Sequence, residues 1–191
     1  IKQVDTDVVN VAQTVFSIDD FNIDDVGALF RSAAGISGSE SSQQLQIVDS
    51  SSGDVFMSVS TNPESRTVFF YPNASLLPTL DFNTAGGINQ GLADVTASRA
   101  TAVAIGVQST VGAWLDYAGS TTSTVRRLRT ATVPVTINER SQRPDLPLFS
   151  AARVNAGAIW RVLEAARQRG EFAATTRWQV TVDARNGVPR M

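Results

Sequence analysis

Residues 45–71, LQIVDSSSGDVFMSVSTNPESRTVFFY, decide the fold class of this chain. Three runs at residues 45–48, 55–59 and 67–71 are rich in β-branched and aromatic side chains. Short polar segments separate them, the first with Ser, Asp and Gly and the second with Asn-Pro, which are typical turn residues. The pattern predicts a β-meander of three short strands joined by tight polar turns.

Two further elements are expected before the meander. Residues 8–18 alternate loosely between apolar and polar side chains, and the run ends in residues 14–18, which favour a strand. A helix should follow, because Asp24 or Asp25 can cap its first turn and apolar residues recur at helical spacing behind them. Gly35 is well placed to end that helix.

Four more segments are expected after the meander. Apolar residues between Leu92 and Tyr117 predict a helical region with a break near Gly106. Residues 125–138 favour strands, and residues 150–172 show the strongest helical periodicity in the chain. Residues 176–183 alternate as a final strand.

The predicted fold class is therefore α+β. N-terminal strands in a mixed or antiparallel sheet are followed by a helical region and a C-terminal strand. Neither an internal repeat nor a clear linker interrupts the pattern, so a single domain spanning residues 1–191 is expected.

The composition excludes several kinds of chemistry. The chain contains no cysteine and no histidine, and its 16 cations include one lysine, Lys2. Disulfides, thiolate catalysis, zinc hydrolysis, Schiff-base chemistry and Ser-His-Asp hydrolysis are therefore not expected. Asp, Glu, Arg and Tyr are left for acid–base work, and neither a metal nor an organic cofactor is predicted.

Positive charge is concentrated in the last part of the chain. Residues 119–191 contain twelve arginines against five acids, although the whole chain has a net charge of −2. Such asymmetry indicates a polyanion or an acidic surface as partner of this region. The alternative is an ordinary solvated surface that uses Arg in place of Lys.

We expect no membrane partner, because no apolar run approaches the roughly 18 residues that a span requires. The chain starts at Ile1 and shows no signal-peptide pattern, so a leader could have been removed. The compartment stays open, with a secreted or virion-associated protein favoured.

The helix expected at residues 150–172 carries the best acid–base pair of the sequence. Glu164 lies four residues after Trp160 and three before Arg167, so these side chains should be neighbours on one stripe. Gly157 would leave space in front of them. In a pocket the pair could act as acid and cation; on the surface it would be an i,i+3 ion pair of little energetic weight.

The segment Glu164-Ala165-Ala166-Arg167, late in a helix, resembles the motif of the ribosome-inactivating proteins, the plant and Shiga-type toxin A chains. Other segments are similar to that family in the same order: the expected strand and first helix, the meander, an aromatic strand-to-loop segment, and a glycine-to-helix block. They lie at residues 16–18, 29–35, 45–59, 68–75 and 86–106.

The resemblance implies an rRNA N-glycosidase that releases one adenine, either active or degenerate. Glu164 would stabilise the oxocarbenium-like sugar or activate water, and Arg167 would protonate the departing base. The family stacks the adenine between two tyrosine rings. The resemblance places these two positions near Phe56 and Asn89, neither of which is a tyrosine; Tyr71 and Trp160 complete the predicted substrate-binding residues. The implied partner is ribosomal RNA, and a second chain could complete the fold.

A second hypothesis is a non-enzymatic, self-assembling structural protein, such as a viral or phage coat or a filament subunit. Abundant Ser, Thr, Val, Ala and Asn are typical of such proteins. The Glu164–Arg167 pair would then be structural, and Trp114, Trp160 and Trp178 would be core or interface anchors. This hypothesis implies a homo-oligomer.

A third reading is a plain RNA-binding module. It depends on the cluster Arg126-Arg127-Leu128-Arg129, with Tyr117 nearby. Three arginines this close are also typical of a solvated strand.

Overall fold

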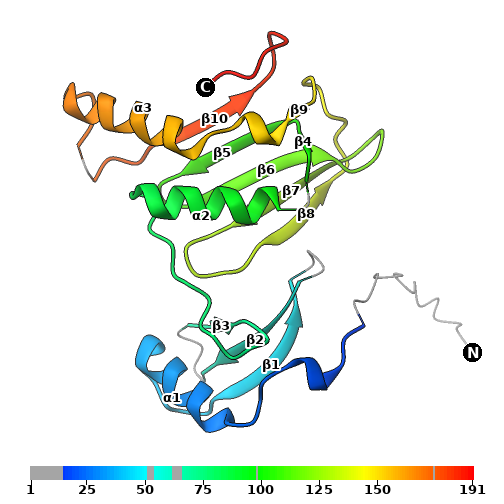
Figure 1. The fold of residues 1–191 in the computed structure, drawn as a ribbon, viewed down its shortest axis with the longest axis vertical. Coiled ribbons are helices and arrows are strands. Elements are labelled where there is room, and N and C mark those ends of the chain that lie inside the picture. Colours follow the sequence, from blue (N-terminus) through cyan, green and yellow to red (C-terminus); the bar gives the residue numbers. More distant parts are fainter. Residues whose placement is uncertain (1–14, 51–53, 62–65, 98, 174) are drawn as a thin grey trace, which may run out of the picture.

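The computed structural model describes residues 15–50, 54–61, 66–97, 99–173 and 175–191. The chain is an α+β protein whose sheets are all antiparallel. Figure 1 shows two parts, a smaller one that contains the N-terminal elements and a larger one that contains the rest. None of the helices in these ranges is long and apolar enough to cross a membrane.

The smaller part is one helix beside a three-stranded meander. Strands β1, β2 and β3 pair in chain order, so the predicted meander is confirmed. The connections at residues 51–53 and 62–65 lie outside the described residues. The element bounds in this part are α1 (Val26–Ser37), β1 (Gln44–Asp49), β2 (Val55–Ser60) and β3 (Val68–Phe70).

Helix α1 begins as predicted but ends later. The Asp25 carboxylate accepts a hydrogen bond from the Ala28 amide at 2.8 Å and caps the first turn. The helix passes through Gly35 and ends at Gly38, whose φ of 78° lies in the left-handed region. The predicted stop at Gly35 is wrong because the left-handed terminal position falls three residues further on.

The predicted strand at residues 14–18 is also wrong for its described residues. Ser17 and Asp20 form a reciprocal capping box around a short 3-10 helix at Ile18–Asp20. Ser17 accepts from the Asp19 amide and Asp20 accepts from the Ser17 amide. These local bonds turn the chain where the alternation of side chains favoured an extended one.

The larger part begins with α2 and is built on a five-stranded sheet. The strand order is β10-β5-β6-β7-β8, and a short pair, β4 with β9, lies beside it. Helices α2 and α3 contact each other, and α2 lies on β6 and β7. The bounds are α2 (Ala85–Thr96), β4 (Thr101–Ala102), β5 (Ala104–Gln108), β6 (Gly112–Ala118), β7 (Thr124–Arg129), β8 (Thr136–Arg140), β9 (Phe149–Ser150), α3 (Ala156–Gln168) and β10 (Gln179–Asp183).

The helical region predicted from Leu92 to Tyr117 is wrong over most of its length. Helix α2 ends at Thr96, and β5 and β6 follow as a hairpin. Gly112 turns the chain with a φ of 136°, and an added Cβ there would lie 2.1 Å from the Arg129 carbonyl oxygen. Both faces of these strands are largely buried, so their sequence is apolar without clear alternation.

The other predicted elements of this part are confirmed, with shifted ends. Strands β7 and β8 flank Pro134, and β10 closes the sheet next to β5. The helix expected from residue 150 starts at Ala156, because Asn155 caps it by accepting from the Ala158 amide at 3.0 Å. It ends at Gln168, shortly before Gly170 with a φ of 73°.

Each part has its own hydrophobic core. In the larger part, Ile105, Val107 and Leu115 are fully buried between the sheet and the two helices. In the smaller part, Met57, Val59 and Phe70 lie under α1 with Leu29 and Ala33. The single-domain expectation stays a prediction, since two cores are compatible with one folding unit or two.

Candidate functional site

The predicted acid–base pair is formed on α3. Arg167 Nη1 donates to Glu164 Oε1 at 3.0 Å, and the two side chains are 19% and 38% exposed. The Arg167 guanidinium also lies 5.5 Å from the Trp160 ring centre and 5.7 Å from that of Phe172. Neither charged residue lines any of the main cavities formed by the described residues.

The remaining predicted site residues lie in other places. Trp160 packs against the core of the larger part. Asn89 lines a cavity of about 310 Å³ between α2 and the segment leading into α3, together with Arg99 and Ala152. Phe56 and Tyr71 line a different cavity. Of the predicted binding residues, the structure therefore brings only Trp160 beside the predicted catalytic pair, whereas Phe56, Tyr71 and Asn89 line cavities that the pair does not reach.

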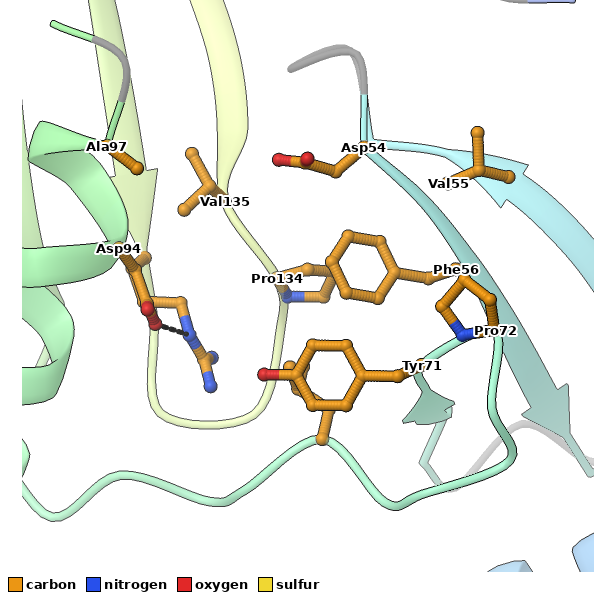
Figure 2. A pocket seen from close by; sticks show the side chains of 11 residues that line it. Asp54, Val55, Phe56, Tyr71, Pro72, Asp94, Ala97, Pro134 and Val135 are labelled. Atoms are coloured by element: carbon orange, nitrogen blue, oxygen red, sulfur yellow. Dashed lines mark hydrogen bonds and ion pairs between the residues drawn. The ribbon is translucent and has the colours of Figure 1, made fainter. Parts of the chain in front are cut away.

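The cavity that holds Phe56 and Tyr71 has a volume of about 410 Å³ and lies between the smaller and larger parts of the chain. Its volume is within the range of small-molecule sites. The start of β2 and the end of β3 form one wall, and the end of α2 and the turn from β7 to β8 form the other (Figure 2). The lining residues are Asp54, Val55, Phe56, Tyr71, Pro72, Leu77, Asp94, Ala97, Arg129, Pro134 and Val135.

Two aromatic rings make the flat wall of this cleft. Strand pairing puts Met57 opposite Phe70, so Phe56 and Tyr71 come one position further along the same ladder. Their ring centres are 5.7 Å apart with a tilt of 44°, which means that the rings contact each other. A base cannot fit between them, and Figure 2 shows both rings extending from β2 and the end of β3 toward the opposite wall.

An ion pair makes the opposite wall. Arg129 Nε donates to Asp94 Oδ2 at 3.0 Å, and Gln90 Nε2 donates to Asp94 Oδ1 at 2.7 Å. Arg129 also donates to the backbone carbonyls of Thr130, Val133 and Pro78 at 2.6 to 2.8 Å. Nearly all donors of this guanidinium are therefore used to hold the wall together, and few are left for a ligand.

Tyr71 is the polar tip of the aromatic wall. Burial raises its pKa above the ordinary value of 10.0, the nearby Asp94 charge raises it further, and Arg129 lowers it in part. The phenol is thus protonated at neutral pH. Its hydroxyl makes no hydrogen bond to another described residue, and in Figure 2 it points toward the wall of the cleft that carries Asp94.

Sequence reasoning missed the charged side of this cleft. Asp54 directly precedes β2, Asp94 lies on α2 and Arg129 on β7, and nothing in their local sequence links them. One signal was present: Arg127 and Arg129 alternate on a strand whose helix-facing side is buried. The structure buries both, with 4% and 1% of their surface exposed.

The arginine cluster of the RNA-binding reading is thereby explained differently. Arg126 forms two hydrogen bonds of 2.7 Å with the Asp116 carboxylate, and its guanidinium lies 4.3 Å from the Trp114 ring centre. Arg127 donates to the Asp94 carbonyl at the end of α2, and burial, with the nearby Arg99, lowers its pKa. These arginines therefore bind other parts of the fold: Arg126 joins β7 to β6, and Arg127 joins β7 to α2.

No group of three or more acidic side chains in the described ranges is arranged to hold a metal ion. Comparisons with protein-family models, with curated proteins and with solved structures gave no match for this chain. The resemblance to ribosome-inactivating proteins therefore stays a prediction.

Proposed function

We propose that this chain binds a small planar ligand in the cleft between its two parts. The observation that carries the proposal is a cavity of about 410 Å³ lined by the Phe56–Tyr71 pair on one side and by Asp94 on the other. A concave, mostly apolar site with a few polar groups is the usual form of a ligand pocket.

The polar groups of the cleft favour a ligand that donates hydrogen bonds. The Asp54 and Asp94 carboxylates are acceptors only, and each oxygen can accept more than one hydrogen bond. Arg129 has few donors left for a ligand. A flat ring with an amino group, such as adenine or cytosine, fits this chemistry through stacking and N–H donation.

Direct binding measurements test the proposal. Calorimetric titration with adenine, cytosine and benzoate should give binding for the two amino-substituted bases and none for benzoate, which is flat but anionic. Phe56→Leu should weaken base binding at least about tenfold because it removes the stacking contact. Asp94→Asn should weaken it to a similar extent because it removes the charge-assisted hydrogen bond. Phe16→Leu is the matched control, because Phe16 is 42% exposed and does not line the cleft.

The proposal fails if none of the bases binds, or if Phe16→Leu weakens binding as much as Phe56→Leu. Equal binding of benzoate would also overturn it, because the carboxylates would then play no part in selection.

Adenine release from ribosomal RNA is a separate proposal that rests on the family resemblance. It requires an acid–base pair at the bound base, and Glu164 and Arg167 lie on α3 away from the cleft. The assay compares adenine released by the wild-type chain, by Glu164→Ala with Arg167→Ala, and by Asp94→Asn. Loss of release in the first variant alone would support the predicted pair.

A second candidate function is self-assembly. Val15 is 95% exposed, Ile18 53% and Phe16 42%. Three of the four residues at positions 15–18 therefore present large apolar side chains to solvent. Such a patch is typical of a contact surface. Light scattering after size exclusion should show a large oligomer that Val15→Ser with Ile18→Ser dissociates; a monomeric wild-type chain would rule this function out.

A further inference from the structure

Two exposed arginines share a cavity where α3 begins and the chain leaves β10, and a third, Arg161, lies over the first turn of α3. Arg153 and Arg190 line one cavity of about 110 Å³ together with Asn155, the residue that caps α3. Figure 1 likewise shows the C-terminal end of the chain beside α3. Arg161 lies outside that cavity but adds its charge to the same end of α3, because a Cβ added at Gly157 in the first turn would lie 3.8 Å from Arg161 Nη1.

None of these three side chains has an acidic partner among the described residues. Arg126, Arg129, Arg140, Arg167, Arg169 and Arg185 all form salt bridges, whereas Arg153, Arg161 and Arg190 form neither salt bridges nor side-chain hydrogen bonds. The nearest carboxylate on β10, Asp183, is held by Arg185 through Nε and Nη2. The negative charge of Asp145 also favours the charged form of Arg185 and raises its pKa. The surface therefore keeps an excess of positive charge.

This placement of charge works against the stability of the helix. The N-terminal end of a helix carries a partial positive charge, and acidic residues in the first turn normally complement it. The first turn of α3 contains no acid, and the Arg161 head group lies over that turn. Unpaired cations at such a position repel both one another and the helix dipole, which points to an anion that offsets the repulsion.

We infer that Arg153, Arg161 and Arg190 form a binding surface for the phosphate backbone of a nucleic acid. Guanidinium groups bind phosphate oxygens in a planar, two-pronged geometry, and all three cations are arginines. The cavity that Arg153 and Arg190 share is too small for an enclosed ligand, and all three arginine side chains are exposed, so an extended polyanion fits better than a small phosphate. These residues lie outside the cleft, so this proposal and the ligand-binding proposal stand or fall separately.

Salt-dependent binding to RNA tests the inference. The probe is a fluorescently labelled single-stranded RNA of mixed sequence, and anisotropy is measured over a series of salt concentrations. Wild-type affinity should fall linearly with salt on logarithmic axes. The triple variant Arg153→Gln, Arg161→Gln, Arg190→Gln should bind at least about tenfold more weakly at low salt, with a slope shallower by about 2, because each phosphate contact contributes about 0.7.

The matched control removes the same charge elsewhere. Arg31→Gln, Arg140→Gln, Arg169→Gln replaces three exposed arginines that are paired with Asp25, Asp116 and Glu171. It should keep the wild-type slope, and thermal unfolding of both variants checks that they fold. Equal loss in both variants would reduce the effect to net charge and overturn the inference. Absence of RNA binding by the wild type would do the same, as would arginine-dependent binding to phosphatidylserine vesicles without binding to RNA.

Discussion

Arg129 and Asp94 form an ion pair that joins β7 to α2 at the wall of the cleft. The distance from Arg129 Nε to Asp94 Oδ2 is 3.0 Å, and the arginine side chain is 1% exposed while that of the aspartate is 23% exposed. Since Arg129 also holds three backbone carbonyls, one buried cation ties together the helix, the turn before β8 and the segment that joins the two parts.

Removing that cation should destabilise the fold strongly. Arg129→Met is expected to lower the free energy of unfolding by about 3–5 kcal/mol, because it leaves a carboxylate and several buried carbonyls without their donor. Urea denaturation measures the change. Arg31→Met is the control. Arg31 Nη2 lies 3.5 Å from Asp25 Oδ2, and the two side chains are 73% and 67% exposed, so the free energy of unfolding should change by no more than about 0.5 kcal/mol.

Gly106 is required by the Trp114 ring on the neighbouring strand. A Cβ at position 106 would lie 2.5 Å from Cε2 and Cζ2 of that ring, so Gly106→Ala must displace it. We expect a loss of about 1–3 kcal/mol and a change in tryptophan emission. Gly35→Ala in α1 is the opposite case, because its Cβ would meet nothing within 4 Å; a gain of about 0.4–1 kcal/mol is expected. Equal effects at the two glycines would refute the packing argument.

The Glu164–Arg167 pair should contribute little to stability and nothing to binding in the cleft. Glu164→Gln is expected to change the free energy of unfolding by no more than about 0.5 kcal/mol, since the carboxylate is more than a third exposed. Arg167→Ala should cost somewhat more, about 1 kcal/mol, because its guanidinium packs between Trp160 and Phe172. Calorimetric titration with adenine should give wild-type affinity for both variants.

Tyr71 makes stability depend on pH in the alkaline range. Its pKa in the folded chain is raised above 10.0, so the folded chain holds the phenol proton more tightly than the unfolded chain does. The contribution of this proton to the free energy of unfolding is present below pH 10. It is lost as pH rises through the pKa that Tyr71 has in the folded chain. Tyr71→Phe should remove this alkaline loss and the late step in a tyrosinate absorbance titration, whereas Tyr117→Phe should leave the late step in place.

The sequence predicted best where neighbouring residues decide the structure. The meander could be predicted because its strands follow one another directly and its turn residues are specific. The cap of α1 could be narrowed to Asp24 or Asp25 because a capping bond spans three residues, and the structure shows that Asp25 is the cap. The existence of α3 and its core-facing side could be predicted because its apolar side chains recur every three or four residues.

The region from residue 97 to residue 117 shows why local pattern fails elsewhere. Strands β5 and β6 have little alternation, because Trp114 is buried on the face away from the helices, against Gly106 and beneath Arg126. An apolar run of this kind fits a helix or a buried strand equally well. The β-branched residues Val103, Ile105 and Val107 were the signal that favoured strands.

By itself the sequence determined that no imidazole or thiolate is present, because the chain contains neither histidine nor cysteine. It determined the elements that short-range contacts stabilise as well. It also determined that Glu164 and Arg167 would pair, because helical geometry brings residues three apart together. Only the tertiary structure decided that the pair lies away from the cleft and that Asp94 meets Arg129, 35 residues later in the chain. The physical reason is that a cleft is defined by long-range packing and burial, which no local propensity encodes.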